Sequence, residues 1–147
     1  MAKTSSRPGR TQAINFFTAD NRLYLVDLPG YGFARVPLQV KKTWGEMVET
    51  YLRRRTNLKA VVVILDIRRD LSNADINLLN WLDQYGIYAI IVLTKADKLS
   101  RNKSIARSKL IGSQLETIST ERPTVFSAKT REGREEIWRK INSAIET

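Results

Sequence analysis

A short motif after an apolar run carries the residues best suited to reading a nucleotide base. Residues Ile87–Leu93 lead into Thr94-Lys95-Ala96-Asp97. A carboxylate at Asp97 can accept hydrogen bonds from both the N1–H and the 2-amino group of guanine, a donor pair that adenine lacks. The methylene stem of Lys95 can cover the face of the base. The motif therefore predicts guanine recognition, although a charged turn in solvent would look the same in isolation.

A second strand end carries a residue suited to Mg²⁺. The run Arg22–Leu28 leads into Asp27-Leu28-Pro29-Gly30. The Asp27 carboxylate can hold Mg²⁺, usually through water, and the amide of Gly30 can donate to a terminal phosphate. An Asp-x-x-Gly sequence also arises in ordinary turns, so it indicates a Mg²⁺ site only in combination with the guanine motif at Thr94–Asp97.

Two further loops fit the same ligand. Residues Phe126-Ser127-Ala128 end a short apolar run, and in GTPases a Ser-Ala-Lys loop offers a backbone N–H to guanine O6; a helix-start serine is the plainer interpretation. Near the start, Thr11 can offer a hydroxyl and a carbonyl to Mg²⁺ and the last phosphate, within a loop that orders on binding. That loop contains Gly9, Arg10, Thr11 and Gln12, and it also fits an ordinary basic loop.

These residues must be positioned by strands that alternate with helices. We expect an antiparallel hairpin of Ala13–Thr18 and Arg22–Leu28. Three strands are expected later in the chain, over 61–65, 87–93 and 124–126, and the first of them should be buried on both faces. The expected helices cover 38–55, follow a capping box of Ser72 and Asp75, and run through 111–118. A last helix carries Ile137, Trp138, Ile141 and Ile145. This order implies a largely parallel α/β sheet with helices on both faces, which binds ligands at the carboxyl ends of its strands.

Composition narrows the class of protein. The 147 residues suit one domain spanning 1–147, and the absence of Cys and His excludes disulfides, thiolate sites and histidine acid–base chemistry. The net charge of +10 favours polyanions such as RNA or an anionic membrane surface. Arg53–Arg55 and Arg68–Arg69 could contact phosphate, or could simply lie in solvent. No apolar run predicts a membrane span, and Met1–Arg10 lacks the apolar middle of a secretory signal.

Together these strings resemble the EngB (YihA/YsxC) family of bacterial ribosome-assembly GTPases, of the TrmE-Era-EngA-YihA type. The resemblance covers essentially the whole chain and is carried by Pro8–Gln12 with Ile14–Phe17, Asp27–Ala34, Thr94–Lys98 and Phe126–Ala128. It implies a Ras-like P-loop GTPase fold, which is a three-layer α/β sandwich with a mostly parallel sheet and one antiparallel hairpin. It also implies binding of GTP or GDP with Mg²⁺, contact with the large ribosomal subunit or its rRNA during assembly, links to cell division and septation, and a cytoplasmic location.

The resemblance also assigns roles in hydrolysis. Thr11 would be the first-switch Mg²⁺ ligand, and Asp27–Gly30 would form the second switch. Tyr31 stands where many small GTPases place a catalytic glutamine, and a phenol cannot orient attacking water in the same way. We therefore expect slow intrinsic GTP hydrolysis, rescued by a K⁺ ion or by the ribosome.

One departure from the family pattern concerns the phosphates. The P-loop sequence Gly-x-x-x-x-Gly-Lys-Ser/Thr cradles them, and this sequence contains no Gly-Lys pair. The family pattern places that loop, the first strand and the first helix before Met1, so we expect weak GTP binding by a shortened domain that is inactive alone. The central strand would then be missing between Arg22–Leu28 and Val61–Asp66, favouring aggregation, a swapped dimer or direct pairing of these strands. The alternative function is an RNA- or ribosome-binding module without nucleotide turnover.

Overall fold

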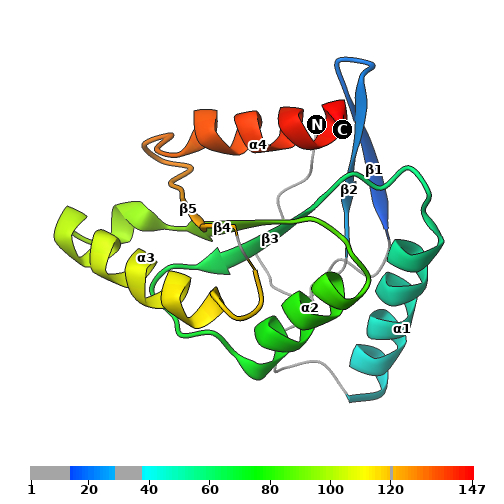
Figure 1. The fold of residues 1–147 in the computed structure, drawn as a ribbon, viewed down its shortest axis with the longest axis horizontal. Helices are drawn as coiled ribbons and strands as arrows, with labels where there is room; N and C mark the ends of the chain where they lie inside the picture. Colours follow the sequence, from blue (N-terminus) through cyan, green and yellow to red (C-terminus); the bar gives the residue numbers. More distant parts are fainter. Residues whose placement is uncertain (1–13, 29–37, 120) are drawn as a thin grey trace. The chain divides into compact units, whose positions relative to one another are not determined.

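The computed structural model describes residues 14–28, 38–119 and 121–147. The chain forms two compact units, residues 1–56 and 57–147, which are described separately below. Figure 1 shows the helices and strands of both units with their labels.

The first unit contains the predicted hairpin. Strands β1 (Asn15–Ala19) and β2 (Leu23–Asp27) pair antiparallel, with Asn15 opposite Asp27 at the open end. At the closed end Asp20 and Asn21 adopt positive φ values of 48° and 53°. Asp and Asn are the residues that tolerate this left-handed conformation best after glycine, because their short side chains can hydrogen-bond locally. The hairpin prediction is therefore confirmed, with each strand one or two residues away from its expected bounds.

Helix α1 (Leu38–Arg54) completes the described part of the first unit and matches the helix expected over 38–55. Just after it, the Arg55 guanidinium carbon lies 5.2 Å from the centre of the Phe16 ring and 4.9 Å from the centre of the Tyr51 ring. The two rings meet edge to face at 6.2 Å. Such cation–π contacts hold an arginine in place, so Arg55 stabilises the first unit itself.

The second unit is built on a parallel sheet in the order β3 (Val61–Asp66), β4 (Ala89–Thr94) and β5 (Thr124–Val125). Helix α4 (Arg134–Glu146) lies on one face of this sheet, and helices α2 (Asn73–Gln84) and α3 (Arg101–Leu115) lie on the other (Figure 1). This is the alternation of strands and helices expected from the sequence. The carboxyl ends of the three strands therefore meet at one edge of the sheet.

The core of the second unit is centred on β4, whose apolar run is buried on both faces. Helix α2 begins at the predicted capping box, in which the Ser72 amide donates to Asp75 Oδ2 at 2.7 Å and the Asp75 amide donates to Ser72 Oγ at 3.2 Å. The buried apolar residues of β4, α2 and α3 are Ile90, Ile91, Val92, Leu93, Leu79, Leu82, Ile111 and Leu115. This packing fixes the strand that leads into the guanine motif.

Strand β3 corrects one expectation. Val63 and Leu65 are buried, but Val62 is 39% exposed and Ile64 is 65% exposed, so the strand is not buried on both faces. The register places these two residues beside Ile90 and Val92 of β4, which are buried. Helix α4 packs mainly on β4, and the Val62 and Ile64 side chains of β3 are left exposed. An apolar run alone could not reveal this, because its pattern is the same at an edge as in the centre.

Strands β2 and β3, which were expected to flank a missing central strand, belong to separate sheets. In the part of the chain that the structure describes, no helix is both long enough and apolar enough to cross a membrane.

Candidate functional site

The end of β4 is tied to the end of β3. Thr94 Oγ1 donates to the Leu65 carbonyl at 3.0 Å, and the Ile67 amide donates to the Thr94 carbonyl at 3.1 Å. The next residue, Lys95, takes a left-handed conformation with φ 64° and ψ 30°. The chain then enters the short 3₁₀ turn η1 (Ala96–Lys98), which carries Asp97. The Thr94 hydroxyl therefore bonds the end of β3, and the turn η1 sets the position of Asp97.

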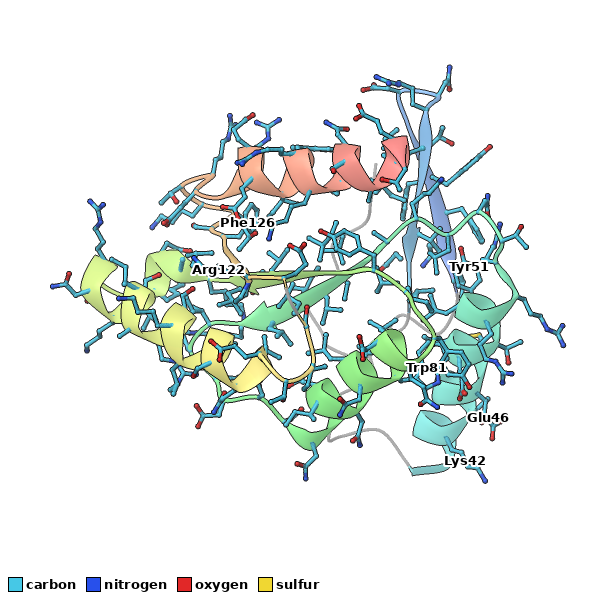
Figure 2. All side chains as sticks on the ribbon, viewed as in Figure 1. Lys42, Glu46, Tyr51, Trp81, Arg122 and Phe126 are labelled. Atoms are coloured by element: carbon cyan, nitrogen blue, oxygen red, sulfur yellow. The ribbon has the colours of Figure 1, made fainter. Side chains whose placement is uncertain are left out.

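The loop after β5 meets the loop after β4. The Phe126 amide donates to the Leu93 carbonyl at 2.8 Å, and the Ala96 amide donates to the Phe126 carbonyl at 3.2 Å. The half-buried Phe126 lies where β5 leads into the loop toward α4 (Figure 2). The structure therefore brings together the two motifs that the sequence predicts to read guanine, although they lie some thirty residues apart in the chain.

A buried serine holds the Asp97 carboxylate. Ser127 is fully buried, and its Oγ donates to Asp97 Oδ1 at 2.8 Å while accepting from the Thr130 amide at 3.1 Å. Within the described ranges, no side chain donates to the other carboxylate oxygen, Oδ2. Among the described side chains, the half-buried carboxylate is therefore held at Oδ1 alone.

The Asp97 carboxylate is also kept ionised. The pKa of Asp97 lies below its ordinary value of 3.8, chiefly because Ser127 donates a hydrogen bond to it. Partial desolvation opposes this shift, and the backbone amide of Asp97 and the nearby cations Lys98 and Lys129 add to it. An acceptor-only carboxylate is the form that can receive two N–H donors from a base.

The loop that carries Ser127 is closed on itself. The Ser127 amide donates to the Glu132 carbonyl at 3.1 Å, and the Arg131 amide donates to the Ser127 carbonyl at 2.8 Å. Gly133 ends the loop with φ 78°, and a Cβ at this position would lie 1.9 Å from the Val125 carbonyl oxygen. Only glycine fits there without displacing β5, so the loop has a fixed position against the strand.

A cluster around Asp66, at the end of β3, was not predicted from the sequence. Arg68 binds the Asp66 carboxylate through two nitrogens, Nε to Oδ1 at 3.0 Å and Nη2 to Oδ2 at 2.8 Å. The Lys95 ammonium lies 3.1 Å from Asp66 Oδ2. The pKa of Asp66 is held well below its ordinary value of 3.8, first by the Arg68 side chain and then by the Arg68 amide and Lys95, against partial desolvation.

This cluster changes the interpretation of the Arg68–Arg69 pair. The sequence suggested that both could contact phosphate, whereas Arg68 is committed to Asp66. Arg107 of α3 fixes the same loop by donating to the carbonyls of Ile67, at 2.9 Å, and Arg69. An acid at the end of a buried strand, followed by an arginine two residues later, is the signal that could have revealed the cluster.

The other predicted residues lie in the first unit, directly after Ser127 in the second unit, or outside the described residues. Asp27 is exposed at the end of β2, and Leu28 follows it half-buried. Ala128 is exposed directly after Ser127. The remaining predicted nucleotide-binding residues lie outside the described residues, and they are Gly9, Arg10, Thr11, Gln12, Pro29 and Gly30.

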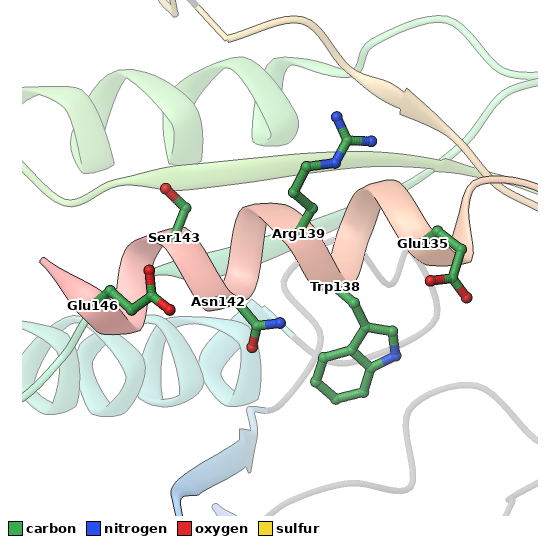
Figure 3. A pocket seen from close by; sticks show the side chains of 6 residues that line it. All are labelled: Glu135, Trp138, Arg139, Asn142, Ser143 and Glu146. Atoms are coloured by element: carbon green, nitrogen blue, oxygen red, sulfur yellow. The ribbon is translucent and has the colours of Figure 1, made fainter.

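A shallow hollow lies along one face of α4 (Figure 3). It contains no predicted site residue, and its side chains come from a single helix, so we do not place the nucleotide there. The residues that line it are Glu135, Trp138, Arg139, Asn142, Ser143 and Glu146.

Residues 1–95 match the family described as "50S ribosome-binding GTPase". The chain is 51% identical over 145 residues to "Probable GTP-binding protein EngB" of Geotalea daltonii, covering 99% of this chain and 70% of that protein. It is 55% identical over 144 residues to the protein of the same name from Syntrophus aciditrophicus, covering 98% and 72% of the two chains.

Two solved structures are similar in fold. The crystal structure of a probable GTP-binding protein engB aligns with a TM-score of 0.78 at 19% identity, covering 97% of this chain and 87% of that one. Translation elongation factor SelB from Methanococcus maripaludis, in complex with the GTP analogue GppNHp, aligns with a TM-score of 0.68 at 20% identity. That alignment covers 93% of this chain and 29% of SelB. At these identities the two structures support the fold alone.

Proposed function

The chain belongs to the EngB family of GTP-binding proteins, and on this premise we propose that Asp97 reads the guanine base of GTP and GDP. The observation that carries the proposal is the state of the Asp97 carboxylate, which is ionised, fixed at Oδ1 by Ser127 and without a donor side chain at Oδ2 among the described residues. A fixed carboxylate can accept from guanine N1–H and the 2-amino group together. Adenine would leave the charge without these donors, which is the kind of mismatch that discriminates strongly between ligands.

The neighbouring residues would complete the base site. We assign the Ala128 amide to guanine O6, because it donates no hydrogen bond within the described part of the chain. The Lys95 stem would cover the face of the base, since long lysine side chains pack their methylenes against flat apolar surfaces. Phe126 would hold the loops after β4 and β5 together through its backbone amide and carbonyl, and Thr94 would tie the end of β4 to the end of β3 through its hydroxyl and carbonyl.

We place the phosphates and Mg²⁺ beside the loops that begin at Gly9 and Asp27. Asp27 is exposed at a strand end, so its carboxylate is open to water. Among the described residues, no three His, Cys, Asp or Glu side chains gather where they could share a metal ion. A site with the Asp27 carboxylate, the Thr11 hydroxyl, water and phosphate oxygens fits the preference of Mg²⁺ for a few protein oxygens. Bound there, the cation would neutralise phosphate charge.

Binding and turnover by this chain are expected to be weak. The sequence has no Gly-Lys pair and thus no P-loop to cradle the phosphates, so base contacts must supply most of the affinity. The phenol of Tyr31 cannot replace a water-orienting glutamine, and GTP hydrolysis should be slow unless K⁺ or the ribosome assists it.

The proposed partner is the large ribosomal subunit during its assembly. Support comes from the wording of the matching family description and from the net charge of +10, which favours rRNA. Links to cell division and septation, and a cytoplasmic location, are part of the same proposal because they follow from the family resemblance.

A second candidate function is an RNA- or ribosome-binding module without nucleotide turnover. Helix α3 favours it, since this helix carries four basic residues and no acidic one. The basic residues are Arg101, Lys103, Arg107 and Lys109. A swapped dimer is a further proposal for the isolated chain, supported by the exposed Val62 and Ile64 on β3.

The proposed function is tested by titrating the ¹⁵N-labelled chain with GDP and, separately, with ADP. We expect the amide signals of Asp97 and Ala128 to shift with GDP, and to shift much less with ADP at equal concentration. Equal shifts with both nucleotides, or none up to the solubility limit, would reject guanine recognition. Binding of RNA without any response to GDP would favour the second candidate.

A further inference from the structure

The Asp66 carboxylate is the meeting point of two loops. Arg68, in the loop after β3, binds both of its oxygens, and the Arg68 amide donates to Oδ1 at 3.0 Å. Lys95, in the loop after β4, places its ammonium 3.1 Å from Oδ2. The Asp66 side chain is only 13% exposed, whereas the Lys95 side chain is 54% exposed. The carboxylate is therefore the fixed partner in this ion pair, and the lysine is the one that it restrains.

The direction of Lys95 matters because Asp97 is only two residues away. The cations Lys98 and Lys129 lower the pKa of Asp97, and the Asp97 charge also acts on Arg68, whereas the Lys95 ammonium is paired with Asp66. The left-handed backbone of Lys95 and the cross-strand pairing of Asp66 with Thr94 place the two ends of this ion pair on neighbouring strand ends. The ion pair with Asp66 therefore holds the Lys95 ammonium away from the Asp97 carboxylate.

We propose that Asp66 is a positioning residue for purine recognition, which anchors the Lys95 ammonium so that the lysine stem lies across the base site and its charge stays away from Asp97. The inference rests on the proposed role of Asp97. Arg68 supports the same arrangement, because its two-nitrogen contact holds the Asp66 carboxylate in one orientation.

Loss of the Asp66 charge would have two effects on the base site. The Lys95 side chain would regain its rotamers, so that covering a base with its stem would carry a larger entropic cost. The released ammonium would also be attracted to the Asp97 carboxylate, where it would compete with the N–H donors of guanine. Both effects weaken guanine binding and leave the sheet itself unchanged.

The test uses Asp66→Asn, which removes the charge but keeps the shape of the side chain. Asp70→Asn is the matched control, because Asp70 lies in the same loop and pairs with Arg107 at 2.9 Å instead of with Lys95. Lys95→Met keeps an unbranched stem and removes the ammonium, and it is made alone and together with Asp66→Asn. Dissociation constants for GDP and ADP are measured by NMR titration of each variant, with thermal unfolding alongside.

We expect Asp66→Asn to weaken GDP binding about three- to fivefold, as for loss of one partly exposed ion pair, and to weaken ADP binding less, because adenine loses only the cover of the lysine stem. Asp70→Asn should bind GDP as the unsubstituted chain does. In the Lys95→Met background, Asp66→Asn should have no further effect, because the partner through which it acts is gone.

Two results would overturn the inference, and a third separates it from the proposed function. Unchanged GDP binding by Asp66→Asn would overturn it. So would a double variant in which Asp66→Asn weakens GDP binding as much in the Lys95→Met background as it does alone. If Asp66→Asn lowers the folded fraction, Asp66→Glu replaces it, because this variant keeps the negative charge. Asp66→Glu should then bind GDP more tightly than Lys95→Met does. Equal or weaker GDP binding by Asp66→Glu counts against the inference. An unsubstituted chain that does not prefer GDP over ADP rejects both proposals, whereas a selective chain that is insensitive to Asp66 rejects only this one.

Discussion

Two carboxylates at neighbouring strand ends have opposite surroundings and therefore different uses. Asp66 is satisfied on both oxygens by Arg68 and Lys95, whereas Asp97 is held on one oxygen by Ser127 and is open on the other. A saturated carboxylate stabilises the loops that contact it, and an open, ionised one can receive a ligand. The chemistry of this edge of the sheet thus depends on how many donors each acid already has.

The ionised state of Asp66 predicts a pH-dependent contribution to stability. Its pKa in the folded chain lies below the ordinary value of 3.8, so its stabilising effect is fully present above that value. The effect is lost as the pH falls below 3.8 toward the folded-state pKa. Asp66→Asn should lower the free energy of unfolding by about 1 kcal/mol near neutral pH, and the difference should shrink below pH 4.

Urea unfolding of both chains across this pH range measures the difference. Asp70→Asn is the control, since its carboxylate is 81% exposed and should show a much smaller change. A difference between the Asp66→Asn and unsubstituted chains that stays constant down to the lowest accessible pH would contradict the assignment of the ion pairs.

At the scale of elements, the position of the base site depends on how the loop after β5 is closed. Gly133 lies against the Val125 carbonyl in a left-handed conformation, and the loop between them presents Ser127 to Asp97. The loop is therefore a rigid part of the sheet edge.

Gly133→Ala should destabilise the second unit by at least about 2 kcal/mol, because a Cβ would clash with backbone and would also be strained at φ 78°. Gly86→Ala is the matched control, since Gly86 has φ 64° but open space around it, and it should cost only about 1 kcal/mol. Thermal unfolding compares the two variants. Equal destabilisation would mean that the contact with β5 is unimportant.

The sequence predicted the elements whose signals are local. The hairpin at Asp20 and Asn21 and the capping box of Ser72 and Asp75 depend on neighbouring residues, so they could be recognised directly. The sequence predicted that the loops carrying Asp97 and Ser127 follow strands of one sheet, but not the hydrogen bond between these two side chains. The capture of Arg68 by Asp66 was missed, because it depends on how a loop folds back on a strand end.

The exposure of Ile64 was missed for a related reason. An apolar run predicts a buried strand, but whether a helix covers each face is decided by the packing of distant elements. In the second unit α4 packs mainly on β4, and the same pattern of residues is therefore buried in one strand and half-exposed in its neighbour.

At the scale of the whole molecule, the excess of 25 basic over 15 acidic residues should govern contact with RNA. Helix α3 concentrates part of this charge in exposed Arg101, Lys103 and Lys109. Arg107 of the same helix is instead engaged with the loop after β3. The exposed basic residues of α3 are therefore one group in the described chain that can meet phosphates.

We expect the chain to bind single-stranded rRNA fragments with an affinity that falls steeply as salt is raised. The double variant Lys103→Gln, Lys109→Gln should reduce the slope of log affinity against log salt by about 1 to 2, because each lysine would contribute one phosphate contact. Lys59→Gln with Arg139→Gln removes the same charge elsewhere and serves as the control. Fluorescence anisotropy over a salt series measures the slope, and equal slopes for both double variants would rule out a specific role of α3.

We propose that the Asp97 carboxylate recognises the edge of a purine that carries N–H donors. Asp97→Asn replaces one acceptor oxygen by an amide donor, so it should pair with xanthine, which has a carbonyl in place of the 2-amino group of guanine. Binding of GDP and XDP to the unsubstituted chain and to Asp97→Asn is therefore the most direct measurement. Asp97→Asn should weaken GDP binding by at least about tenfold and reverse the preference in favour of XDP. A GDP preference that is the same in both chains would contradict it.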